Sequence, residues 1–276
     1  MHRLRYVSAT TGEVVELDGP ITFSGIASDV RAKQWGYDLQ GRSITNVRRA
    51  AQEGKMEIVT TLAEADRMSL IFDADVASRQ PGSMESDGWH QRCYMVSDKP
   101  VSISGNRAKL DCGVVLLDGA WRKGDTYVMR AASGDSRGTK VYPYTYSYTY
   151  SSEIGGLYLE VPGVLPAPFR FIFYGPAVNP SVRIGNNLYQ YNIAVPAGGH
   201  LIVDTIPRSA VTLVDPIGVR TNEFDCAERG SGEGCGMYAF EHLPPGTVAV
   251  TWSDMFGFDL TVWHERGGLP YESDSA

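Results

Sequence analysis

Two cysteines and a row of tyrosines are the side chains of this sequence with the clearest chemical character. Cys226 and Cys235 lie in the glycine-rich segment DCAERGSGEGCGMY, with eight residues between them. Structural zinc sites usually pair thiols two to four residues apart, so this spacing argues against a metal site. A metal site is one of three alternatives for this loop. The other two alternatives are a pair of free thiols, and a disulfide that forms after the protein leaves a reducing compartment.

The tyrosine row is the segment VYPYTYSYTY, residues 141–150. In an extended chain alternate side chains share one face, so the five rings would all lie on the same side of a strand. Such a row suits a platform that stacks sugars or bases, a membrane-interface belt, or a half-buried strand whose rings pack against protein. An exposed row with almost no charge would promote aggregation, which favours coverage by protein. The residues are Tyr142, Tyr144, Tyr146, Tyr148 and Tyr150.

The remaining reactive residues form no catalytic pattern. The five histidines are scattered, and no two have the spacing that places a pair on one helix face around a metal. The chain has no Gly-x-Ser-x-Gly elbow and no phosphate-binding glycine motif. A glycosidase pair of acids can be distant in sequence, but nothing selects one pair over another. We therefore expect no catalytic residue, no cofactor and no metal.

Composition excludes several classes of protein. The formal net charge is −7, and the 25 lysines and arginines form no basic run, so a nucleic-acid groove is not expected. The longest apolar stretches are far shorter than the roughly 20 residues that span a bilayer, and the N-terminus lacks a signal-peptide apolar region. The sequence predicts a soluble chain made in the cytoplasm, with Cys93 and Cys112 as buried core thiols.

The elements that must position these residues are mainly strands. Turn signals at Thr11–Gly12, Asp118–Gly119 and Gly185–Asn187 recur between short β-like segments, a pattern typical of β-sandwiches. One stretch, 61–77, instead has apolar residues at helical spacing, with Thr61 and Glu64 as a capping box. From Phe169 onward eight further segments, including 237–243, are predicted to be strands of a second sandwich.

Three prolines within 161–169 mark a change of composition, from which two domains follow. We expect an N-terminal β-sandwich over residues 1–155 with a helix near 62–77, and a C-terminal β-sandwich over 156–268. Residues 269–276 form a polar tail that frays unless its Leu-Pro-Tyr segment returns to the first domain.

The second half carries a series of features in a distinctive order. The segment FRFIFYGPAVNPSVRIGNNLYQYNIAVPAGGHLIVDT contains Gly175-Pro176 and Asn179-Pro180, then a hairpin, then the apolar-Asp-Thr ending at Ile202–Thr205. It is followed by TNEF, by FEHLPPGTVAVTW with its Pro245-Gly246 turn, and by a last strand before GGLPY. This order resembles the C-terminal domain of siphophage distal tail proteins. The early hairpin, the strand and helix at 55–77 and the Tyr-Pro-Tyr run are similar to the N-terminal half of that family.

The resemblance implies a bacteriophage virion component at the tail tip, made in the bacterial cytoplasm. It implies a homohexameric ring of N-terminal domains that joins the tail tube protein to the baseplate, with galectin-like C-terminal jelly rolls outside. Further implied partners are the tail-tip hub or tail-associated lysin, a receptor-binding protein and the tape measure protein, with no nucleic-acid specificity and no membrane insertion. The tyrosine row would then lie at the domain junction. The alternative is a carbohydrate-binding or glycan-degrading tail protein acting on cell-surface polysaccharide.

Overall fold

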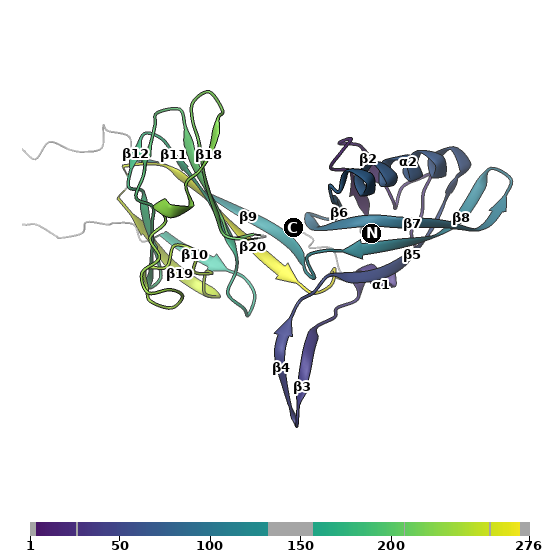
Figure 1. The fold of residues 1–276 in the computed structure, drawn as a ribbon, viewed down its shortest axis with the longest axis horizontal. Coiled ribbons are helices and arrows are strands. Elements are labelled where there is room, and N and C mark those ends of the chain that lie inside the picture. Colours follow the sequence, from purple (N-terminus) through teal and green to yellow (C-terminus); the bar gives the residue numbers. More distant parts are fainter. Residues whose placement is uncertain (1–3, 26, 132–156, 207, 254, 271–276) are drawn as a thin grey trace, which may run out of the picture. The chain divides into compact units, whose positions relative to one another are not determined.

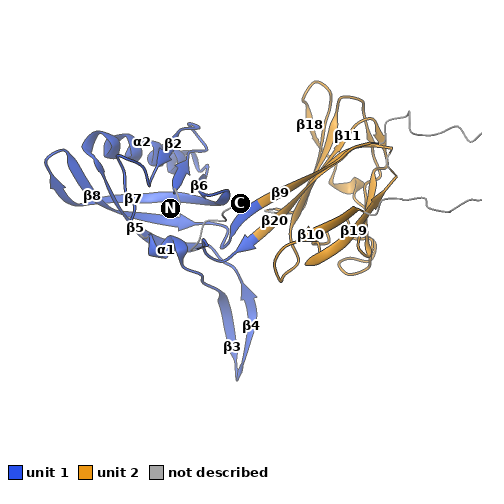
Figure 2. Cartoon of the chain, turned by 180° about the vertical axis from the view of Figure 1, so that it is seen from behind, with its two compact units in different colours: residues 1–123, 265–276 blue, residues 124–264 orange. Residues whose placement is uncertain are grey.

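A computed structural model describes residues 4–25, 27–131, 157–206, 208–253 and 255–270, and it is mainly β as predicted (Figure 1). The chain divides into two compact units (Figure 2). Unit 1 comprises residues 1–123 and 265–276, and unit 2 comprises residues 124–264. No helix among the described residues is long and apolar enough to cross a membrane.

Unit 1 is built on an antiparallel sheet with the strand order β2-β1-β6-β7-β8-β5. The β1–β2 hairpin turns at Gly12, where the sequence predicted a turn, and Gly12 has a positive φ of 72°. A separate hairpin, β3–β4, belongs to the same unit, as does the short helix α1. The bounds are β1 Arg5–Val7, β2 Val14–Glu16, α1 Ser28–Arg31, β3 Gly36–Gln40, β4 Ser43–Arg48, β5 Gln52–Thr61, β6 Gly82–Ser86, β7 Trp89–Ser104 and β8 Arg107–Leu116.

Helix α2, Leu62–Ser78, confirms the helix predicted at this position. Thr61 is its N-cap, and the Thr61 hydroxyl oxygen accepts a hydrogen bond from the Glu64 amide at 3.3 Å, which satisfies an amide that lacks an intrahelical partner. The helix ends at Arg79, which has a left-handed φ of 56°. Its apolar stripe, including Met68 and Phe72, is buried in the core of unit 1.

Asp75 is a fully buried carboxylate on α2 that ties the helix to the β1–β2 turn. It accepts hydrogen bonds from the Tyr6 hydroxyl at 2.6 Å, the Ser8 hydroxyl at 2.9 Å and the Thr10 amide at 2.8 Å. Burial alone would raise the pKa of Asp75, but these hydrogen bonds outweigh it and hold the pKa below its ordinary value. Burial and the Asp75 hydrogen bond raise the pKa of Tyr6, which therefore stays a donor.

Unit 2 is a β-sandwich. One layer has the order β18-β17-β16-β11-β20, and the other has the order β10-β19-β13-β14. Strands β12 and β15 form a separate short pair, and a 3-10 turn, η2, covers Phe224–Cys226. The bounds are β10 Leu157–Val161, β11 Phe169–Tyr174, β12 Ala177–Val178, β13 Ser181–Ile184, β14 Asn187–Gln190, β15 Ala194–Val195, β16 His200–Asp204, β17 Ala210–Val214, β18 Arg220–Asn222, β19 Gly246–Trp252 and β20 Phe258–Arg266.

The core of unit 2 is unusually aromatic because alternate residues of β11 are all phenylalanines that point inward. Phe169, Phe171 and Phe173 are fully buried and contact Tyr189 and Tyr191 from the second layer, with ring centroids 5.2 to 5.7 Å apart. The two tyrosine hydroxyls donate to the carbonyls of Glu241 and Ala239, each at 2.8 Å. Each buried hydroxyl therefore has an acceptor, so the two tyrosines lie in the sandwich core without an unsatisfied donor.

Three features of the fold differ from the sequence predictions. Residues 237–243 do not form a strand. They contain a turn in which Ala239 and Phe240 are buried, and the hydroxyls of Tyr191 and Tyr189 donate to the carbonyls of Ala239 and Glu241. The β3–β4 hairpin was not predicted. The contact boundary lies at residues 123 and 124, whereas composition placed it near residue 155. Strand β9, Trp121–Met129, passes this boundary, and its residues Tyr127 and Met129 belong to the core of unit 2.

Removal of the Asp75 carboxylate should destabilise unit 1. Asp75→Ala leaves the Tyr6 and Ser8 hydroxyls without their acceptor, so we expect the free energy of unfolding to fall by about 3 kcal/mol. Asp73→Ala is the matched control, because Asp73 is an exposed residue of the same helix and carries the same change in helix propensity. Denaturant unfolding measures both, and equal midpoints would contradict a structural role for Asp75.

Candidate assembly surfaces

The β3–β4 hairpin has one apolar and one polar face. Leu39 pairs with Ile44 and Asp38 pairs with Thr45, so successive pairs point to opposite sides. Tyr37, Leu39, Ile44 and Val47 share the apolar face, and each is between 48% and 73% exposed. The opposite face carries Asp38, Gln40, Ser43, Thr45 and Arg48.

A β-bulge places Val47 on the apolar face. Between the pairs Gly36–Arg48 and Asp38–Thr45, β4 has one residue more than β3, so Asn46 and Val47 lie opposite Tyr37. Asn46 adopts a left-handed φ of 50°, and its side-chain amide donates to the Asp38 carboxylate at 2.7 Å. The bulge therefore preserves the segregation of apolar from polar side chains along the whole hairpin.

The apolar face of the hairpin has no cover among the described residues. An isolated two-stranded hairpin is only marginally stable in water, and a contiguous exposed apolar face usually marks a contact surface. Figure 1 shows the hairpin projecting away from the sheet of unit 1, which explains why its side chains remain exposed. The hairpin is thus a candidate contact surface.

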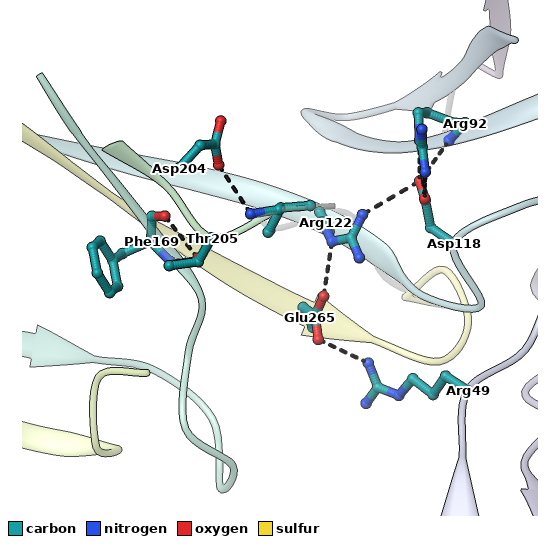
Figure 3. Close-up of polar contacts among 9 residues, drawn as sticks. Arg49, Arg92, Asp118, Arg122, Phe169, Asp204, Thr205 and Glu265 are labelled. Atoms are coloured by element: carbon teal, nitrogen blue, oxygen red, sulfur yellow. Dashed lines mark hydrogen bonds and ion pairs between the residues drawn. The ribbon is translucent and has the colours of Figure 1, made fainter. Parts of the chain in front are cut away.

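A network of charged side chains holds the root of this hairpin (Figure 3). Arg49, directly after β4, stacks on the Trp35 ring at 4.8 Å, next to the start of β3. Arg49 Nη1 lies 3.4 Å from Glu265 Oε2, and Arg122 Nε donates to Glu265 Oε1 at 2.8 Å. Glu265 therefore joins the hairpin root to β9 within unit 1.

The network continues to Asp118, whose side chain is only 5% exposed. Asp118 accepts hydrogen bonds from Arg92, with Nη2 at 2.6 Å, and it pairs with Arg122 at 3.3 Å. Burial alone would raise the pKa of Asp118, but the hydrogen bond from Arg92 and the charge of Arg122 outweigh it and lower the pKa. The next residue, Gly119, has a φ of 63°, and a Cβ there would lie 2.6 Å from the Ala50 carbonyl oxygen.

In unit 2 the segment Ile202–Thr205 fastens β16 to β11 (Figure 3). Asp204 accepts a hydrogen bond from Arg170 Nε at 2.8 Å. The Thr205 hydroxyl accepts from the Phe169 amide at 2.9 Å and donates to the Phe169 carbonyl at 2.8 Å. The Asp-Thr ending noted in the sequence therefore ties the end of β16 to the start of β11, its neighbour in the layer.

The alternative function, carbohydrate binding, would require exposed aromatic rings on which sugars can stack. In unit 2, Tyr158 and Tyr174 are exposed, and the Tyr174 hydroxyl donates to Asp259 at 2.7 Å. Trp252 and Trp263 are half-buried in β19 and β20.

The predicted tyrosine row, Tyr142 to Tyr150, lies outside the described residues, so its position at a domain junction stays a prediction.

The four cysteines are free thiols in very different surroundings. Cys93 and Cys112 are buried, as the sequence predicted. Cys226 is half-buried against the core of unit 2, and burial raises its pKa to about 11. Cys235 is exposed, and a hydrogen bond from the Met237 amide contributes most to lowering its pKa. A late disulfide between Cys226 and Cys235 stays a prediction.

The described residues include no group of three or more histidine, cysteine or carboxylate side chains that could hold a metal ion. The residues that sequence reasoning missed are those of the hairpin and its root. One signal was present, because Gly41-Arg42 separates two stretches that alternate apolar and polar residues.

Comparison with solved structures connects this fold to phage tails. Chains of the phage p2 baseplate in its activated conformation, solved once with strontium and once with calcium, each match with a TM-score of 0.61 and 11% identity. The match covers 98% of this chain and 100% of the other. The crystal structure of the SPP1 Dit protein, described as a paradigm of the hub adsorption apparatus in phages infecting Gram-positive bacteria, matches with a TM-score of 0.57 and 9% identity.

The SPP1 Dit match covers 96% of this chain and 99% of that protein. No protein-family model matches the sequence, and no curated protein is detectably similar to it. The chain therefore has the fold of these phage baseplate and hub proteins, as its resemblance to distal tail proteins predicted. At such low identity the likeness is one of fold.

Loss of the Asp118 charge should destabilise unit 1 in a pH-dependent way. Asp118→Asn leaves Arg92 and Arg122 without their shared anion, and we expect a loss of about 2 kcal/mol at pH 7, less than for a fully buried pair because Arg92 is 42% exposed. A lowered carboxylate pKa stabilises the protein above about pH 4 and ceases to do so as the pH falls further.

The difference between wild type and Asp118→Asn should therefore shrink below about pH 4 in urea unfolding. Asp111→Asn is the control, because Asp111 forms a surface pair with Lys55, whose side chain is 74% exposed. An equal, pH-independent loss in both variants would contradict the role given to Asp118.

The thiols should react in a fixed order with iodoacetamide at neutral pH. Cys235 is exposed and has a lowered pKa, so it should be alkylated first, while Cys226 follows more slowly. Cys93 and Cys112 should react only after unfolding, because burial raises both pKa values. Peptide mass spectrometry measures the four rates, and a denatured sample provides the control. Equal rates for Cys226 and Cys235 in native protein would refute this order.

Proposed function

We propose that this chain is a structural component of a bacteriophage tail, a distal tail protein whose copies form a homohexameric ring. The ring joins the tail tube to the baseplate and supports host-adhesion proteins. The fold shared with the p2 baseplate chain and the SPP1 Dit protein supports this role. The role requires no catalytic residue, and we propose none.

The observation that carries the proposal is the amphipathic β3–β4 hairpin. Its apolar face, Tyr37, Leu39, Ile44 and Val47, is too exposed for a chain that acts alone. Closed rings use contacts in which one patch meets a different patch on the next copy, so a projecting hairpin suits the donor side of such a contact. The hairpin root is held by charged groups, so the apolar face is presented in a fixed direction from unit 1.

We assign unit 2 to the outside of the ring, where adhesion proteins and the tail-tip hub would bind. Several of its loop residues are strongly exposed and apolar, among them Val164 and Ile217. Ile217 lies in a tight turn because Asp215 accepts hydrogen bonds from the Ile217 and Val219 amides. Binding functions concentrate on such loops when a rigid scaffold positions them.

Charging the hairpin's apolar face should abolish the oligomer. In Leu39→Glu with Ile44→Glu, two like charges replace an apolar cross-strand pair, and burial of those charges at an interface is strongly unfavourable. We expect native mass spectrometry to find wild-type oligomers built from the 30.2 kDa chain and a monomeric variant.

The matched control is Gln40→Glu with Ser43→Glu, which places the same two charges on a cross-strand pair of the polar face. This control should oligomerise like the wild type. The proposal would be lost if the Leu39 and Ile44 variant assembled normally. It would also be lost if wild-type protein stayed monomeric at high concentration and images of the assembled tail contained no six-fold ring of this chain.

A further inference from the structure

We infer that the outer edge of β7, from Val96 to Ser104, is the surface of a second copy of this chain that receives the β3–β4 hairpin as an added strand. The inference rests on the proposed function and names the partner surface of the hairpin. It concerns residues of unit 1 alone.

The first observation is an unpaired strand edge. On one side β7 pairs with β8 from Cys93 to Ser104. On the other side β6 pairs only with Trp89 to Cys93, and among the described residues no strand continues this pairing toward Ser104. The second half of β7 therefore presents a row of backbone groups that can accept another strand. Pro100 is compatible with this position, because proline occurs on edge strands.

The second observation is that the apolar face of the sheet extends past its cover. Ile103 pairs with Ala108, which is buried on the core face, and yet Ile103 is 63% exposed. Pro100 is exposed on the same face, because it pairs with Leu110, which is buried. Val96 and Val101, the extra residues of the two β-bulges, are also exposed, but they lie on the opposite face, beside Ser97 and Ser102. A strand added at this edge would bring cover to Pro100 and Ile103.

The hairpin has the two properties that this edge requires. Its outer edges are unpaired among the described residues, because β3 and β4 pair only with each other. Its apolar residues all lie on one face, so an added hairpin would place Leu39 and Ile44 on the same side as Pro100 and Ile103. The polar face of the hairpin would then continue the polar side of β7, which carries Ser97, Lys99 and Ser102.

The occupant is a second copy because the hairpin cannot serve its own edge. Figure 1 shows the hairpin leaving the sheet of unit 1 from the β5 side, away from the β7–β8 turn. Each copy thus offers one donor and one acceptor, which are different surfaces. Contacts of this kind propagate head to tail and close into a ring when the rotation permits.

Two complementary variants test the inference. Ile103→Glu charges the acceptor, and Leu39→Glu with Ile44→Glu charges the donor. Each variant alone should be monomeric at a concentration at which the wild type is oligomeric. An equimolar mixture should form heterodimers that grow no further, because one intact donor meets one intact acceptor. Native mass spectrometry, with one variant isotopically labelled, identifies the heterodimer.

Ser104→Glu is the matched control for the acceptor, because Ser104 is next to Ile103 and points to the opposite face. This control should oligomerise like the wild type. An oligomeric Ile103 variant, or a mixture that stays monomeric, would overturn the inference. An oligomeric Leu39 and Ile44 variant would overturn the proposed function itself, so the two failures are distinguishable.

Hydrogen exchange provides a readout that does not depend on the folding of the acceptor variant. Amides of residues 96–104 in the wild-type oligomer should exchange at least about tenfold more slowly than in the Leu39 and Ile44 variant, because an added strand bonds them. Amides of β8 should exchange equally in both, since β8 is already paired on both sides. Equal exchange at residues 96–104 would overturn the inference.

Discussion

The contact between Glu265 and two arginines connects the parts of unit 1 on which the proposed assembly depends. Glu265 holds Arg49 at the hairpin root and Arg122 on β9, while Asp118 holds Arg122 and Arg92. Both carboxylates are largely shielded from water, so each needs its cations, and the cations in turn fix the backbone segments that carry them. The direction of the hairpin is a consequence of this charge balance.

Unit 1 combines a hydrogen-bonded buried carboxylate with exposed apolar side chains at its periphery. In the core, Asp75 accepts hydrogen bonds from the Tyr6 and Ser8 hydroxyls. The apolar residues of the hairpin and of the β7 edge, in contrast, remain in water. Leaving such surface uncovered forgoes about 25 cal/mol for every Å² that could be buried, and an open edge invites aggregation. A chain that presents both features gains stability when copies cover one another.

Unit 2 achieves its stability in another way. Its sandwich is filled by phenylalanines of β11 and by two tyrosines whose hydroxyls bind backbone carbonyls in the 237–243 turn. That turn precedes β19 and follows the glycine-rich loop, so the aromatic core also anchors the loop that carries Cys235. A rigid sandwich with exposed loops suits a scaffold that displays binding surfaces, which is the role proposed for this unit.

The sequence by itself determined the mainly-β class, the α2 helix with its Thr61 cap, the turns at Gly12 and Gly185 and the burial of Cys93 and Cys112. These depend on neighbours in the chain or on residue type. Only the tertiary structure decided that Glu265 pairs with Arg49, that the 237–243 segment is a turn, and that Leu39 and Ile103 stay exposed. Alternation predicts a strand with two faces, but which face is covered depends on residues far away in the sequence.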